Sequence, residues 1–197
     1  LDPSRLYGKY IGESEQRLAR ALDSVDAMAP VVMWIDEIEK GLATSGDGDG
    51  GVSRRLLGTF LRWMQDRPDG VFLVATANNV AGLPPELLRK GRFDEIFFVD
   101  LPDEISRRAI LSVHITDRGR DPDEFDLASL AALSTGFSGA EIEAAVVGAL
   151  YRAFAKDENM ENGHIASEMQ ATVPLSVARS EEISALRLWA RERTVPA

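Results

Sequence analysis

The chain has 197 residues, of which 45% are hydrophobic, enough for one ordinary domain or for a core with a small second unit. Its 32 acidic and 22 basic residues give a formal net charge of -10, which disfavours nucleic acid and favours a protein partner. The absence of cysteine excludes a disulfide framework and a thiolate metal site. No apolar stretch approaches the roughly 20 residues that span a bilayer, and we expect a cytoplasmic protein without a membrane segment.

Apolar spacing along the first half of the sequence predicts alternating helices and strands. The expected elements, in chain order, are an amphipathic helix at 14–29, a strand at 31–35, a loop at 45–51, a helix at 54–65, and strands at 71–78 and 95–101. The run VVMWI at 31–35 is apolar throughout, which is typical of a strand covered on both faces of a parallel sheet. Strands and helices in this order predict a doubly wound α/β layer.

The later part of the sequence changes character, because every segment with clear periodicity is helical. Helical spacing is found at residues 104–115, 126–134, 138–155 and 181–193. In the last of these, Ile183, Leu186 and Trp189 form a stripe that we expect to dock onto the rest of the protein. We therefore predict an α/β subdomain at residues 1–102 and a helical subdomain at 103–197.

Polar side chains follow two of the predicted strands at the point where each strand ends. Asp36 and Glu37 follow the run at 31–35, and Asn78 ends the run at 71–78. Ligands of open α/β sheets lie outside the carboxyl ends of the strands, so we expect these three side chains to share one site. An aspartate there can hold Mg2+, directly or through its water, and an adjacent glutamate can orient and deprotonate an attacking water.

These residues carry a resemblance to the AAA-type ATPases, which extends from about residue 5 to about residue 155. WIDEIEK resembles the Walker B element of that family, and ATANN resembles its sensor-1 segment. The resemblance implies a P-loop NTPase fold, here an incomplete large subdomain followed by a helical lid, with ATP and Mg2+ as cofactors. It also implies that Asp36 holds Mg2+ mainly through water, Glu37 activates the attacking water and Asn78 positions it.

Further segments extend the resemblance to other parts of the nucleotide site. LPPELLRKGRFD resembles the second region of homology, in which Arg89 and Arg92 match the arginine fingers that reach the γ-phosphate of the neighbouring subunit. TGFSGAEIEAA resembles the start of the sensor-2 helix, where Gly139 and Ala140 lie close to the nucleotide. His114 matches a histidine that lies beside the nucleotide in several such proteins.

KYIGESE resembles the first pore loop of the family, with Tyr10, Ile11 and Gly12 as its aromatic-aliphatic-glycine unit. An aromatic side chain that faces a central channel can grip an extended polypeptide without reading its sequence. The resemblance therefore implies a homo-oligomeric ring, a hexamer, that acts on a protein substrate and not on nucleic acid. Within the family the chain most resembles a group found in cyanobacteria, some plastids and other bacteria, which has no settled substrate. The segments that carry this narrower match are LLGTFLRWM, VATANN, LPPELLRKGRFDEIFFVDLP and PLSVARSEEISALRLWARER.

The sequence contains no phosphate-binding loop of the pattern GxxxxGK(S/T), which AAA enzymes need to cradle the phosphates. It also begins without an initiator methionine. We therefore expect the chain to be a C-terminal portion of a longer polypeptide that supplies this loop. We expect the isolated 197 residues neither to bind ATP tightly nor to hydrolyse it.

Two functions of different class are open from the sequence. One is a subunit of an ATP-driven motor, and the other is a non-catalytic nucleotide-sensing or partner-binding module on the same core. Intact Glu37, Asn78 and both arginines favour the motor. The acidic balance argues against a clamp-loader-like role on nucleic acid, and the absence of HExxH argues against a fused metalloprotease.

Overall fold

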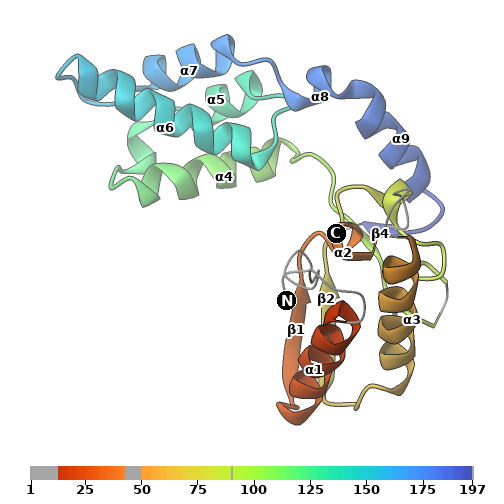
Figure 1. The fold of residues 1–197 in the computed structure, drawn as a ribbon. Coiled ribbons are helices and arrows are strands. Elements are labelled where there is room, and N and C mark those ends of the chain that lie inside the picture. The colour runs from red at the N-terminus through yellow and green to blue at the C-terminus, as the bar shows by residue number, and fades with distance from the viewer. Residues whose placement is uncertain (1–12, 43–49, 90, 197) are drawn as a thin grey trace. The chain divides into compact units, whose positions relative to one another are not determined.

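The computed structural model of the chain describes residues 13–42, 50–89 and 91–196, and it divides into two compact units (Figure 1). Unit 1 comprises residues 1–96, and unit 2 comprises residues 97–197. Each unit has its own cluster of buried hydrophobic residues. The boundary that we predicted after residue 102 falls within unit 2, just before its first long helix.

Unit 1 alternates helices with a parallel pair of strands. Its elements are α1 (Glu13–Ala27), β1 (Val31–Ile35), α2 (Ile38–Leu42), α3 (Gly50–Asp66), β2 (Val71–Ala75) and the 3-10 helix η2 (Val80–Gly82). The strands pair in a register that places Val31 opposite Val71. The helix predicted at 14–29 and the strand predicted at 31–35 are confirmed, whereas α3 begins at Gly50, within the segment that we expected to be a loop.

The two faces of the β1–β2 sheet differ in burial. Met33 and Ile35 of β1 belong to a core cluster that also contains apolar residues of α1 and α3. The alternate residues Val32 and Trp34 are 64% and 58% exposed, and Phe72 of β2 is 67% exposed. Our expectation of a strand covered on both faces is therefore wrong for the described residues. An uninterrupted apolar run cannot distinguish one covered face from two, because successive side chains of a strand point to opposite sides.

Unit 2 begins with a short strand whose partner lies at the other end of the unit. β3 (Phe97–Phe98) and β4 (Val195–Pro196) form a second two-stranded parallel sheet, with Phe97 opposite Val195. The strand predicted at 95–101 is present as the two residues of β3, but among the described residues it pairs with β4 and does not join β1 and β2 in the layer that we expected. Local periodicity identifies an extended segment, but it carries no information about a partner far along the chain.

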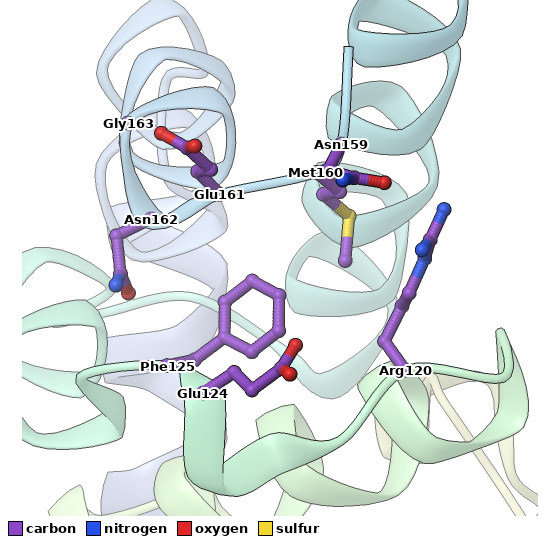
Figure 2. A pocket seen from close by; sticks show the side chains of 8 residues that line it. All are labelled: Arg120, Glu124, Phe125, Asn159, Met160, Glu161, Asn162 and Gly163. Atoms are coloured by element: carbon purple, nitrogen blue, oxygen red, sulfur yellow. The ribbon is translucent and has the colours of Figure 1, made fainter.

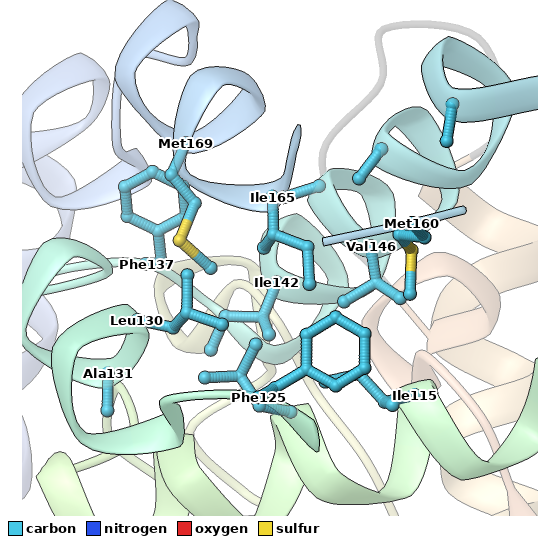
Figure 3. Packing of buried hydrophobic residues seen from close by; sticks show 14 residues of the cluster. Ile115, Phe125, Leu130, Ala131, Phe137, Ile142, Val146, Met160, Ile165 and Met169 are labelled. Atoms are coloured by element: carbon cyan, nitrogen blue, oxygen red, sulfur yellow. The ribbon is translucent and has the colours of Figure 1, made fainter. Parts of the chain in front are cut away.

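The rest of unit 2 is helical. Its elements are α4 (Glu104–Asp117), the 3-10 helix η3 (Pro122–Glu124), α5 (Leu127–Leu133), α6 (Gly139–Ala155), α7 (Asn162–Ala171), α8 (Leu175–Ala178) and α9 (Ser180–Ala190). In the core shown in Figure 3, Ile115 of α4, Ile142 of α6 and Ile165 of α7 are fully buried. The four predicted helices are confirmed. We did not predict α7, in which only Ile165 and Met169 are buried.

The last helix is tied to the segment that follows β3. Arg187 of α9 forms a bidentate ion pair with Asp100, in which Nε donates to Oδ2 at 2.9 Å and Nη2 donates to Oδ1 at 2.8 Å. Ile183, Leu186 and Trp189 are half-buried, so the predicted stripe is the less exposed part of α9. No helix that the described residues form is long and apolar enough to cross a bilayer.

Candidate functional site

β1 ends in a turn that presents two consecutive carboxylates. Asp36 and Glu37 separate β1 from α2, and Glu37 adopts a left-handed backbone with φ 48°. A non-glycine residue persists in this region only where its surroundings hold it there. Two hydrogen bonds to Thr76 do so: Glu37 N donates to Thr76 Oγ1 at 3.0 Å, and Ile38 N donates to the Thr76 carbonyl oxygen at 2.9 Å.

The hydroxyl of Thr76 also contacts the first carboxylate. Thr76 Oγ1 donates a hydrogen bond to Asp36 Oδ1 at 2.5 Å. The Asp36 side chain is exposed, and its second oxygen, Oδ2, has no hydrogen bond or ion pair among the described residues. One hydroxyl therefore serves both acidic residues, as a donor to the first and as an acceptor from the backbone of the second.

Both oxygens of the Glu37 carboxylate have partners. Asn78 Nδ2 donates to Oε1 at 3.1 Å, and Lys40 Nζ donates to Oε2 at 2.5 Å. The hydrogen bond to Glu37 raises the pKa of Lys40, against an opposing effect of burial, and the negative charges of the nearby carboxylates raise it further. Lys40 is therefore a cation at neutral pH, and the Glu37 carboxylate is held between an ammonium and an amide.

A third carboxylate holds the backbone of Asn78. Glu39 is 8% exposed, and its Oε1 accepts a hydrogen bond from Asn78 N at 3.0 Å. Its second oxygen is buried without a hydrogen-bond partner among the described residues. Sequence reasoning did not single out Glu39, Thr76 or Lys40. Their closeness in the sequence to Asp36, Glu37 and Asn78 was the only local sign that they belong to the site. Thr76 in particular is inconspicuous, because a β-branched residue is common in strands.

The arrangement fits a magnesium ion that is held largely through water. The described residues contain no group of three His, Cys, Asp or Glu side chains that could hold a metal by themselves. Mg2+ keeps several waters and is commonly held by one or two carboxylates together with substrate phosphates. Asp36 offers such a carboxylate, since it is exposed at the carboxyl end of β1 with Oδ2 unengaged among the described residues.

The two arginines of the predicted finger segment differ in their surroundings. Arg92 is half-buried, and its Nη1 donates to the carbonyl oxygen of Leu61 on α3 at 2.5 Å. Arg89 is exposed, and its side chain makes no hydrogen bond or ion pair with any residue that the structure describes. Arg89 can therefore reach a second molecule without breaking a contact, whereas Arg92 is anchored to α3.

The predicted nucleotide contacts of unit 2 lie on neighbouring helices. Gly139 and Ala140 form the first turn of α6, which Ser138 caps by accepting a hydrogen bond from Glu141 N. A side chain added at Gly139 would lie 3.7 Å from Ile110 of α4, one turn before His114. His114 Nδ1 is buried without a hydrogen bond among the described residues. The structure thus gathers these residues in unit 2, and it gathers Asp36, Glu37 and Asn78 in unit 1.

Two other features do not contribute to this site. The predicted pore residues Tyr10, Ile11 and Gly12 lie outside the described residues. Unit 2 has a cavity of about 560 Å³. Figure 2 shows side chains that line it, among which Phe125 and Met160 are apolar. Its other lining residues are Arg120, Glu124, Asn159, Glu161, Asn162 and Gly163. None of these eight residues is a predicted site residue.

Comparison with known proteins relates the chain to one family. Residues 1–101 match the ATPase family associated with various cellular activities (AAA). The chain is 41% identical to an uncharacterized AAA domain-containing protein, ycf46, of Trieres chinensis, and 38% identical to that of Pyropia yezoensis. Each of these alignments covers 96% of this chain and 39% of the relative. The chain is also 35% identical to a cell division cycle protein 48 homolog of Archaeoglobus fulgidus, over 71% of this chain and 19% of that protein.

Proposed function

The chain belongs to the AAA family of ATPases, and on that premise we propose that it is part of an ATP-hydrolysing motor that remodels or translocates a protein substrate. It spans 39% of the length of the curated ycf46 relatives, so the activity is assigned to the polypeptide that contains it. The observation that supports the proposal best is the 3.1 Å hydrogen bond between Asn78 and Glu37, next to Asp36 at the ends of adjacent parallel strands.

In this proposal Glu37 is the general base. Its carboxylate would take the proton of the water that attacks the γ-phosphate of ATP. Asn78 holds one carboxylate oxygen, so the orientation of the base is set before the nucleotide arrives. Lys40 donates a hydrogen bond to the other oxygen. When Asn78 or Lys40 gives up its hydrogen bond, the carboxylate oxygen that is freed would accept the proton of the water.

Asp36 and the phosphates would together hold the metal. Bound Mg2+ supplies polarisation of the phosphoryl oxygens and shields their charge. Asp36 would reach it through a water on Oδ2, the oxygen that Thr76 leaves unengaged. His114, Gly139 and Ala140 would contact the nucleotide.

The proposal extends to an oligomer of identical subunits, a hexameric ring. Arg89 and Arg92 would act in trans, on the γ-phosphate bound by the neighbouring subunit, and would stabilise negative charge in the transition state. Arg89 supports this role, because its side chain is exposed and has no hydrogen bond or ion pair among the described residues. Tyr10, Ile11 and Gly12 would contact the protein substrate in the central channel.

The test compares Mg2+-dependent ATP hydrolysis by three proteins. They are the 197-residue chain, an extended protein in which an N-terminal segment with a phosphate-binding loop precedes the chain, and the extended protein with Glu37→Gln. We expect hydrolysis only by the extended protein, and we expect Glu37→Gln to abolish turnover while ATP still binds.

Two results would contradict parts of this proposal. Full turnover by the Glu37→Gln protein would remove Glu37 from the general-base role. An extended protein that binds ATP and never hydrolyses it would favour the alternative function, a non-catalytic nucleotide-sensing or partner-binding module, and ATP-dependent capture of a partner would then be the relevant assay.

A further inference from the structure

We infer that Thr76 is a positioning residue of the hydrolytic site, which aligns Asp36 and Glu37 through a single hydroxyl group; this inference rests on the proposed function. The hydroxyl donates to Asp36 Oδ1 at 2.5 Å and accepts from Glu37 N at 3.0 Å. Asp36 lies 40 residues before Thr76 in the sequence, so the contact joins the ends of two different strands. Thr76 itself touches neither nucleotide nor water in the proposed reaction.

The backbone of Thr76, like its side chain, makes two hydrogen bonds to the end of β1 and the turn that follows it. Thr76 N donates to the carbonyl oxygen of Ile35 at 2.9 Å, and the Thr76 carbonyl oxygen accepts from Ile38 N at 2.9 Å. These bonds continue the parallel pairing of β1 and β2 for one residue beyond its last pair, Ile35 with Ala75. A hydroxyl on such a residue has a defined position, and both of its hydrogen bonds follow from that position.

The bond to Glu37 N bears on the orientation of the general base. Glu37 has φ 48°, a backbone conformation that a non-glycine residue adopts only when it is held. The direction of its Cα–Cβ bond depends on that conformation, and so does the reach of its carboxylate toward Asn78. When the hydroxyl is lost, the turn can relax toward an ordinary backbone, and the carboxylate moves with it.

The bond to Asp36 bears on how that carboxylate faces a ligand. A hydroxyl that donates to Oδ1 fixes the rotation of the carboxylate and leaves Oδ2 as the oxygen without a partner among the described residues. Residues that orient a metal-binding carboxylate by hydrogen bonding typically affect metal affinity or activity by about 10- to 100-fold when they are replaced. Thr76 orients the Asp36 carboxylate in this way, through the hydrogen bond from its hydroxyl.

The test uses a matched pair of variants. Thr76→Val keeps the β-branched shape and loses the hydroxyl, whereas Thr76→Ser keeps the hydroxyl and loses a methyl group. The first measurement is hydrogen exchange of the Glu37 amide by NMR in the 197-residue chain, without nucleotide. We expect exchange to be about tenfold faster in Thr76→Val, as the loss of one hydrogen bond implies, and near the original rate in Thr76→Ser.

The second measurement is steady-state hydrolysis by the extended polypeptide. We expect Thr76→Val to lower kcat by about tenfold or more with little change in KM for ATP, and Thr76→Ser to restore most of it. Because a loss of folded protein would also lower the apparent kcat without changing KM, thermal unfolding must show that each variant is fully folded at the assay temperature, and kcat is then compared between variants that are. Thr76→Ala supplies a second variant without the hydroxyl if Thr76→Val does not fold.

The inference is wrong if Thr76→Val leaves the Glu37 amide as protected as before, or if Thr76→Ser behaves like Thr76→Val. A failure of the proposed function would be recognised by a different set of results. In that case the unchanged extended polypeptide shows no hydrolysis that depends on Glu37, while the exchange measurement still reports whether the hydroxyl holds the turn.

Discussion

The side-chain amide of Asn78 and the carboxylate of Glu37 are joined by a 3.1 Å hydrogen bond, although the two residues are 41 positions apart in the sequence. Asn78 follows β2 and Glu37 follows β1, and the parallel pairing of these strands brings their ends together. The backbone of Asn78 is held in turn by Glu39, which is buried. The relationship between the proposed base and its neighbour is therefore set by the sheet.

Replacement of Asn78 by Ala should slow ATP hydrolysis by the extended polypeptide. Because the amide orients Glu37, we expect kcat to fall by about 100-fold with KM for ATP nearly unchanged, as for other oriented donors at reacting groups. Asn79→Ala is the matched control, since the Asn79 side chain caps η2 and is not among the hydrogen-bond partners of Glu37 in the described part of the chain. Steady-state kinetics of both variants decide the matter, and equal effects of the two would contradict a specific role for Asn78.

Arg89 and Arg92 should differ in their effects on stability. Arg92 donates to the Leu61 carbonyl oxygen, so Arg92→Ala should lower the free energy of unfolding of the chain by about 1.5 kcal/mol. The exposed Arg89 has no such partner among the described residues, and Arg89→Ala should change it by less than about 0.5 kcal/mol. Urea unfolding of both variants measures this. Similar losses of stability in both would show that the Leu61 contact contributes little.

The same two substitutions should have similar effects on activity if both arginines act on the neighbouring γ-phosphate. We expect each to lower kcat of the extended polypeptide by about 1,000-fold. Mixing an arginine variant with Glu37→Gln subunits should restore part of the activity, because the base of an arginine variant can then meet the intact arginine of a neighbouring Glu37→Gln subunit. No recovery on mixing would argue against action between subunits.

The ion pair between Asp100 and Arg187 should make stability depend on pH. Partial burial raises the pKa of Asp100, but the hydrogen bonds from Arg187 and from Leu101 N lower it by more, so its pKa lies below the ordinary 3.8. A lowered folded-state pKa stabilises the protein at pH values above the unfolded-state pKa, and this stabilisation is lost as the pH falls through the folded-state pKa.

We therefore expect Asp100→Asn to lower the unfolding free energy at pH 7, and the difference from the unchanged chain to vanish as the pH falls well below 3.8. Both side chains are partly exposed, so the effect at pH 7 should not exceed about 1 kcal/mol. Urea unfolding across this pH range is the measurement. Arg191→Gln is the control, because Arg191 is a nearby arginine without an ion pair among the described residues. If the effect of Asp100→Asn on stability does not vary with pH, the charge of Asp100 is not the cause of that effect.

The core of unit 2 should be sensitive to truncation at Ile142. This residue is fully buried in α6, so Ile142→Ala should lower the unfolding free energy by about 2 to 5 kcal/mol. Ile105→Ala is the matched control, because Ile105 is also helical but is 78% exposed, and its effect should stay within about 0.5 kcal/mol. Equal effects at the two positions, measured by thermal or urea unfolding, would contradict the packing described here.

Part of the candidate site could be predicted from the sequence, and part could not. Asp36, Glu37 and Asn78 were predictable, because polar residues that directly follow apolar strand runs lie at one edge of a parallel sheet. Thr76, Glu39 and Lys40 were not, because the roles of these residues depend on contacts across the sheet or on the turn at Glu37. The family motif likewise did not distinguish the exposed Arg89 from the anchored Arg92.

The sequence by itself determined α4, α5, α6 and α9 of unit 2, the strand at 31–35 and the family, because helical periodicity and short motifs are local properties of the chain. Only the tertiary structure decided that one face of β1 is exposed, that Phe97 pairs with Val195, and that a threonine hydroxyl joins Asp36 to Glu37. The physical reason is that strand partners, side-chain burial and hydrogen bonds between distant residues arise from packing, which no short window of sequence contains.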